Sequence, residues 1–152
     1  MNNQTPRALA LSLLLRCEHD NLYSNLILDT AIRRNTLSDA DRGLLTALVY
    51  GVLEKKLTLD YLIGQLSDRP ADGLDAEVRI LLRMGLYQLR FMDRIPAHAA
   101  LNETVSLAPK RSRGFVNALL RRYTREGEQI ALPDREREPL AYLSVAYSFP
   151  VA

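Results

Sequence analysis

Apolar residues three or four positions apart recur along almost the whole of this 152-residue chain. That spacing puts side chains on one face of an α-helix, whereas a half-buried strand needs strict alternation of apolar and polar residues. Strand signals are nearly absent, because the one Asp-Gly pair, Asp72-Gly73, has no alternating apolar flanks. The sequence therefore predicts an all-α fold.

Helix start and stop signals divide this pattern into separate helices. Ser24, the sequence at 38–41 and Asp75 are suited to cap helix starts, and Pro109 is a break. The helix that follows Asp75 is apolar around most of its circumference, which predicts that it is the core helix of the second half. We expect helices over residues 6–18, 24–34, from 38–41 to about 66 with a bend or restart near 58–60, 76–94, 97–108 and 114–125.

The bulk properties exclude several classes of protein. A chain of this length buries about 68–70% of its unfolded surface, so it needs neither a metal nor a disulfide to fold. Cys17 is the one cysteine, and two histidines do not complete a zinc ligand set. The longest mostly apolar stretch, 8–15, is too short to span a bilayer and is no signal peptide. We expect a cytoplasmic protein with no metal, no cofactor and no membrane association.

Positive charge is concentrated near the end of the helical region. Residues 104–125 contain six cations and no Asp or Glu, a local charge of +6. On the helix expected over 114–125, Arg121 and Arg125 face away from the apolar side, and Arg122 lies at the border. The other three cations, Lys110, Arg111 and Arg113, precede that helix. Free backbone N–H groups and the helix dipole there would attract an anion. The alternative interpretation is a charged face that is merely solvated.

Four further arginines fall within an arc of about 60° on the helix over 76–94. We expect Arg83 to be paired inside the protein, whereas Arg90 and Arg94 are the better candidates for binding RNA. The fourth arginine of this stripe is Arg79. Tyr87 lies beside this stripe and either stacks on an unpaired base or belongs to the core.

Other polar residues have plainer interpretations. His98 lies near a helix start with no nucleophile nearby in the sequence, so we expect it to cap or pack rather than to catalyse a reaction. Asn102, Glu103 and Asn117 are expected to form hydrogen bonds at helix ends or between helices.

Three phrases in the second half, ILLRMGLYQL, RIPAHAALNETVSLA and GFVNALLRRY, resemble the NusB family of helical RNA-binding modules in order and spacing. In detail they are most similar to the NusB-like domain that precedes the catalytic domain in RsmB-type 16S ribosomal RNA cytosine-C5 methyltransferases. SNLILDTAI and DRGLLTALVYGVL extend the similarity over about residues 6 to 126. The resemblance implies two packed three-helix bundles and a positively charged RNA-binding face that includes the first helix, where this chain has Arg7.

The resemblance also implies a division of the chain near residue 127. Residues 1–127 would form the NusB-like RNA-binding domain. Residues 128–152 are polar and charged around Pro133 and Pro139 and then apolar over 140–145, which we interpret as a linker with a loosely tethered end. AYSFP resembles the segment in which such enzymes continue into their catalytic region, so 128–152 would form a truncated junction toward a methyltransferase domain.

Enzymes of that type need S-adenosylmethionine and a cysteine nucleophile in Pro-Cys and Thr-Cys motifs, and Cys17 belongs to neither. We therefore expect a non-catalytic targeting module that binds RNA, in the first place ribosomal RNA. One alternative is a free-standing NusB-type transcription antitermination factor that binds RNA and a small-subunit ribosomal protein. Another is a helical module for protein interaction. The expected RNA-binding residues are Arg7, Arg90, Arg94, Lys110, Arg111, Arg113, Arg121, Arg122 and Arg125.

Overall fold

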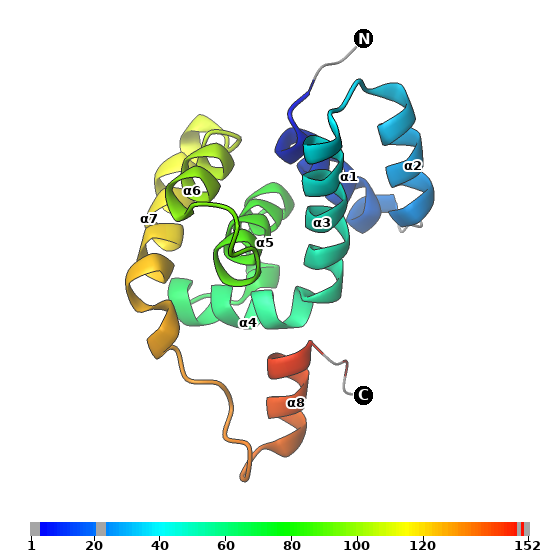
Figure 1. The fold of residues 1–152 in the computed structure, drawn as a ribbon. Coiled ribbons are helices and arrows are strands. Elements are labelled where there is room, and N and C mark those ends of the chain that lie inside the picture. Colours follow the sequence, from blue (N-terminus) through cyan, green and yellow to red (C-terminus); the bar gives the residue numbers. More distant parts are fainter. Residues whose placement is uncertain (1–3, 21–23, 149, 151–152) are drawn as a thin grey trace. The chain divides into compact units, whose positions relative to one another are not determined.

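A computed structural model describes residues 4–20, 24–148 and 150 of the chain (Figure 1). This part of the chain forms α-helices and short 3-10 turns and contains no strand, so the prediction of an all-α fold is confirmed. No helix in it has both the length and the apolar composition that crossing a bilayer requires. The α-helices are α1 (Pro6–Asp20), α2 (Ser24–Arg34), α3 (Asp39–Glu54), α4 (Lys56–Ser67), α5 (Ala76–Phe91), α6 (Ala97–Val105), α7 (Lys110–Glu126) and α8 (Pro139–Tyr147).

The chain divides into two compact units, residues 1–51 and 52–152. In the first unit α1 packs against α2, and most of α3 belongs to the same unit. Two side chains cap helix starts in this region, and the one at Ser38 was predicted from the sequence. Thr5 Oγ1 accepts the Ala8 N–H at 3.1 Å, and Ser38 Oγ accepts the Asp41 N–H at 3.1 Å. The predicted cap by Ser24 lies outside the residues whose side chains are described.

In the second unit α5 is the central helix. It packs against α4, α6 and α7, and α6 also packs against α7, so α5, α6 and α7 form a three-helix bundle. The prediction that this is the core helix is confirmed, because its apolar side chains are almost completely buried. Those exposed by 1% or less are Ile80, Leu81, Leu82, Met84 and Leu86.

Three helix ends come earlier in the sequence than predicted. The break after α3 comes at Lys55, where φ −100° and ψ 17° leave helical geometry, rather than near 58–60. α5 ends at Phe91 because Met92 adopts φ −115° and ψ 77°, three residues before the predicted end. α6 ends at Val105, because the N–H groups of Leu107 and Ala108 bond three residues back and form a turn. Neither Pro nor Gly marks these positions, so the sequence carried no stop signal there.

The C-terminal helix α8 packs on α4, and the ends of the two helices satisfy each other's backbone groups. The first N–H groups and the last carbonyl groups of a helix have no partner inside it. Here the N–H of Leu57, in the first turn of α4, donates to Ser148 Oγ at 3.0 Å. In return the Thr58 hydroxyl donates to the Val145 carbonyl in the last turn of α8. The expectation of a loosely tethered end is therefore wrong for residues 139–148.

The segment between α7 and α8 is also attached to α4. The Tyr61 hydroxyl donates to the Ala131 carbonyl. Burial raises the pKa of Tyr61 above its ordinary value, and the nearby Glu138 carboxylate raises it further. The hydroxyl therefore keeps its proton, and this hydrogen bond, well into the alkaline range. The domain boundary predicted at 127 and the junction toward a methyltransferase domain stay predictions.

We expect Ser148→Ala to loosen α8 from α4. Losing a side chain that caps a helix costs about 1 kcal/mol, which lowers the free energy of local opening by a similar amount. Amide hydrogen exchange over 139–147 should then become about fivefold faster, while amides in α5 exchange at the wild-type rate. Unchanged exchange in α8 would show that Ser148 does not hold this helix.

Candidate nucleic-acid interface

Four of the six cations of helix α7 lie on one exposed face. At about 100° per residue, four cations fall within an arc of roughly 100° opposite the buried side chains of Val116, Leu119 and Leu120. We call these four exposed residues, which are Lys110, Arg111, Arg121 and Arg125, the cationic face. Gly114 and Ala118 lie between them on the same side and are also exposed, so no large side chain stands between the charges.

α7 begins at Lys110, four residues before its predicted start. Pro109 occupies the N-cap position with φ −55° and ψ 147°, and the helix begins directly after it. Gly114 lies within the helix rather than at its start. The first turn of α7 therefore contains cations and no acidic side chain. Cations at this positive end of a helix dipole are unfavourable by about 0.3–1 kcal/mol each, and a bound anion offsets that cost.

The charges of the cationic face are not neutralised by carboxylates. None of the ion pairs within the part of the chain that the structure describes involves any of these four residues. Arg121 donates from Nε to Asn117 Oδ1 at 3.1 Å, a neutral partner that orients the guanidinium and leaves its charge intact. The four cations are therefore available to a polyanion.

The other predicted binding residues of α7 are held by the protein itself. Arg122 donates to Glu126 Oε2 at 3.0 Å and to the Leu66 carbonyl at 2.6 Å. Arg113 donates from Nη2 to the Ala108 carbonyl at 3.1 Å and lies off the cationic face. Arg122 is paired with a carboxylate and Arg113 points to another side of α7, so neither belongs to the cationic face.

The arginine stripe of α5 divides as the sequence suggested for Arg83. Its guanidinium forms a bidentate pair with Asp60 of α4, with Nε–Oδ1 at 2.7 Å and Nη2–Oδ2 at 3.0 Å, so the predicted internal pairing is confirmed. Arg79 donates to the Leu74 carbonyl at 2.9 Å. Arg90 donates to the Tyr123 hydroxyl at 3.2 Å and is half-buried. Arg94 is exposed after the end of α5.

Two remaining candidates belong to other helices than α7. Arg7 is half-buried in the first turn of α1, in the first unit. Tyr87 packs against Phe91 with ring centroids 5.3 Å apart, and burial followed by the charge of Glu54 raises its pKa. Tyr87 is thus a half-buried packing residue in this structure.

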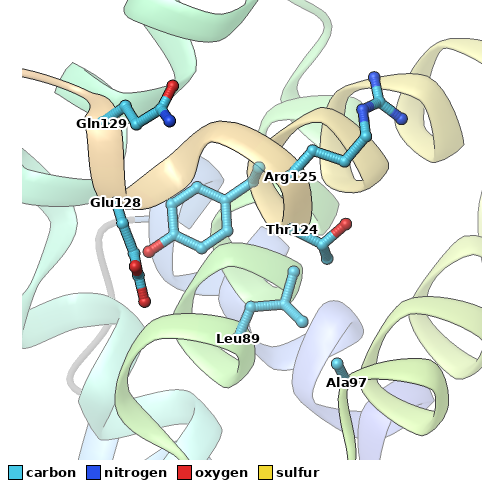
Figure 2. A pocket seen from close by; sticks show the side chains of 7 residues that line it. Leu89, Ala97, Thr124, Arg125, Glu128 and Gln129 are labelled. Carbon is cyan, nitrogen blue, oxygen red and sulfur yellow. The ribbon is translucent and has the colours of Figure 1, made fainter.

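Beside the cationic face lie two adjoining hollows between α6 and α7, which sequence reasoning missed. One has a volume of about 370 Å³ (Figure 2), and the other about 210 Å³. Ala97 at the start of α6 and Thr124 of α7 line both, so the hollows are neighbours, and together we call them the α6–α7 groove. Figure 2 shows Leu89 and Thr124 facing each other beside Ala97, whereas Arg125 extends away from Leu89 and Ala97.

Metal chemistry has no candidate site in the described residues, because they contain no cluster of three His, Cys, Asp or Glu side chains that could hold an ion. An all-helical module with an unneutralised cationic helix face is the class that this fold and surface define. The NusB family model matches residues 4–125, and the chain belongs to the NusB family. The resemblance inferred from the sequence is confirmed.

Relatives of the chain carry names that refer to ribosomal RNA. It is 38% identical over 154 residues to the probable ribosomal RNA small subunit methyltransferase B of Bacillus subtilis, covering 99% of this chain and 34% of that protein. The protein of the same name from Synechocystis is 40% identical over 149 residues, covering 95% of this chain and 33% of its own length. The ribosomal RNA small subunit methyltransferase B of Pseudomonas putida is 45% identical over 108 residues, covering 68% and 24%. The chain spans about a third of the length of the first two relatives.

Proposed function

We propose that this chain is an RNA-binding module that directs a methyltransferase to small-subunit ribosomal RNA and does not itself transfer the methyl group. The observation that carries the proposal is the cationic face of α7, which has no carboxylate partner in the described chain. Contacts from such a face go to phosphates, which position a protein on RNA, while shape selects the site. The relatives' names supply the class of RNA.

A non-catalytic role is supported by the state of the one cysteine. Cys17 is half-buried in α1, and burial raises the pKa of its thiol although Arg16 opposes the shift. A thiol with a raised pKa forms less of the thiolate that a nucleophile requires. The cysteine chemistry expected of RNA cytosine-C5 methyl transfer therefore has no suitable residue in this chain.

The proposal predicts that removing the cationic face weakens RNA binding. We expect the triple variant Arg111→Gln/Arg121→Gln/Arg125→Gln to bind a folded small-subunit ribosomal RNA transcript about tenfold more weakly at low salt. Each lost phosphate contact should also reduce the slope of log affinity against log salt by about 0.7–0.9. Fluorescence anisotropy titrations over a series of salt concentrations measure both quantities, and circular dichroism checks that the fold is retained.

A charge-matched control separates the effect of this face from the effect of net positive charge on RNA binding. Arg33, Arg34 and Arg137 are exposed and lie outside the cationic face, and their replacement by Gln removes the same charge. We expect that control to keep the wild-type salt slope. Equal weakening by both triple variants would overturn the proposal, because net charge alone would then account for binding. An absence of RNA binding by the wild-type chain would favour a protein-interaction module instead.

A further inference from the structure

We infer that the α6–α7 groove takes one unpaired nucleotide of the RNA, with its base in the groove and its flanking phosphates on Arg121 and Arg125. The inference rests on the proposed function and adds a site for an extruded base to it. The larger hollow, at about 370 Å³, falls within the range of about 300–1,000 Å³ that is usual for small-molecule sites.

The walls of the groove suit a base. Leu89 and Ala97 provide apolar surface, and the half-buried ring of Tyr123 lines the same hollow. An aromatic ring on which an unpaired base stacks is the recurring element of single-strand recognition, worth about 1–3 kcal/mol per base.

Tyr123 is held in place before any ligand arrives. Its hydroxyl accepts the hydrogen bond from Arg90, and its ring lies directly against the backbone of Gly127. A Cβ at residue 127 would lie 2.6 Å from Cε1 of the ring, so a larger residue there would displace it. Gly127 itself has φ −58°, so the close approach of the ring, and not an unusual backbone, requires the glycine. A ring fixed in this way loses little freedom when a base stacks on it.

The charges in the groove separate the base from the phosphates. Glu128 lines the larger hollow, and its carboxylate repels a phosphate there. Arg121 and Arg125 line the two hollows separately and are four residues apart on α7, about 6 Å along the helix axis. They therefore offer positive charge at two successive positions on one side of the groove.

Polar groups in the groove match the edge of a base with an exocyclic amino group. A carboxylate accepts a hydrogen bond from such a group, as when Asp or Glu binds cytosine N4, and it repels the O4 carbonyl of uracil. Glu128 therefore favours adenine or cytosine over uracil. Gln129 lines the same hollow, and His98 and Asn102 line the smaller one, so further donors and acceptors face the groove.

Filling the groove tests the inference. Ala97 is exposed and lines both hollows, so Ala97→Phe places a ring where the base would enter. The probes are an RNA hairpin with an unpaired loop of about seven nucleotides and a blunt duplex of the same stem. We expect Ala97→Phe to bind the hairpin about tenfold more weakly, the loss of one stacked base, while duplex affinity and the salt slope stay unchanged.

The matched control is Ala40→Phe, because Ala40 is also an exposed alanine in the first turn of a helix, α3. It should leave hairpin binding at the wild-type value. Asn102→Ala adds no bulk and should weaken hairpin binding severalfold, so the test does not depend on the folding of Ala97→Phe. In the wild-type protein, hairpins with adenine or cytosine loops should bind more tightly than one with a uracil loop, and Glu128→Gln should reduce that difference.

Hairpin affinity that is unchanged in both Ala97→Phe and Asn102→Ala would overturn the inference. The proposed function would survive that result if the arginine triple variant still weakened RNA binding. Conversely, a triple variant with normal RNA affinity would refute the proposed function whatever the groove variants do. Equal affinity for all loops would remove the assigned base preference.

Discussion

Asp60→Ala is expected to lower the free energy of unfolding by about 3 kcal/mol, because it removes a carboxylate that pairs with the buried guanidinium of Arg83. The side chain of Arg83 is 7% exposed and that of Asp60 26%, so water replaces the lost carboxylate poorly. A domain of this size is stabilised by only about 5–15 kcal/mol, so the change removes a large fraction of the total. Urea denaturation followed by circular dichroism measures it.

Two further variants sharpen that test. Asp93→Ala removes an exposed carboxylate near the end of α5 and should cost less than about 0.5 kcal/mol. Asp60→Leu/Arg83→Met replaces both charges by apolar groups and should recover most of the lost stability, since the buried guanidinium is removed together with the Asp60 carboxylate. If Asp60→Ala were as mild as Asp93→Ala, the pair would not hold α4 against α5.

Gly85→Ala should destabilise the protein by about 2 kcal/mol, although alanine is the better helix former by about 1 kcal/mol. A Cβ at residue 85 would lie 2.6 and 2.7 Å from the two methyl carbons of Leu120 and 3.2 Å from its Cγ. Leu120 is completely buried, so its methyl groups have no room to move away. Gly85 is what allows α5 and α7 to approach closely at this point.

The same substitution at Gly114 should have the opposite sign. An added Cβ there meets nothing within 4 Å, so Gly114→Ala should stabilise the protein by about 1 kcal/mol. Leu120→Ala makes room at the contact, and the double variant Gly85→Ala/Leu120→Ala should lose at least about 1 kcal/mol less than the sum of the single changes. Additive losses in this double-mutant cycle would show that the two side chains do not compete for the same space.

Local signals predicted most of the fold. Ser38 caps α3 as its place in the sequence indicated, and α5, apolar on nearly every side, is the core helix. α8 was missed because its nine residues are too few for an isolated helix in water. Its Val145 carbonyl accepts the Thr58 hydroxyl, and Ser148 Oγ at its end accepts the Leu57 N–H. Both partners are more than 80 residues away in sequence and leave no local signal.

Only the part of the candidate site that lies on α7 could be predicted from the sequence. Periodicity alone placed Arg121 and Arg125 on the exposed side of α7. It could not reveal that Arg122, at the border of that side, reaches the Leu66 carbonyl on α4, because that contact depends on how two helices meet. The α6–α7 groove was invisible for the same reason, since each helix supplies only one of its walls.

The mutual capping of α4 and α8 makes α4 a mechanical link. The first turn of α4 is hydrogen-bonded to the end of α8. About one turn further along α4, Asp60 forms an ion pair with Arg83 of the core helix α5. A force applied at Ser148 therefore acts through α4 on the middle of α5, because hydrogen bonds join α8 to α4 and an ion pair joins α4 to α5. A group attached after Ser148 would therefore be coupled to the core of this unit through α4.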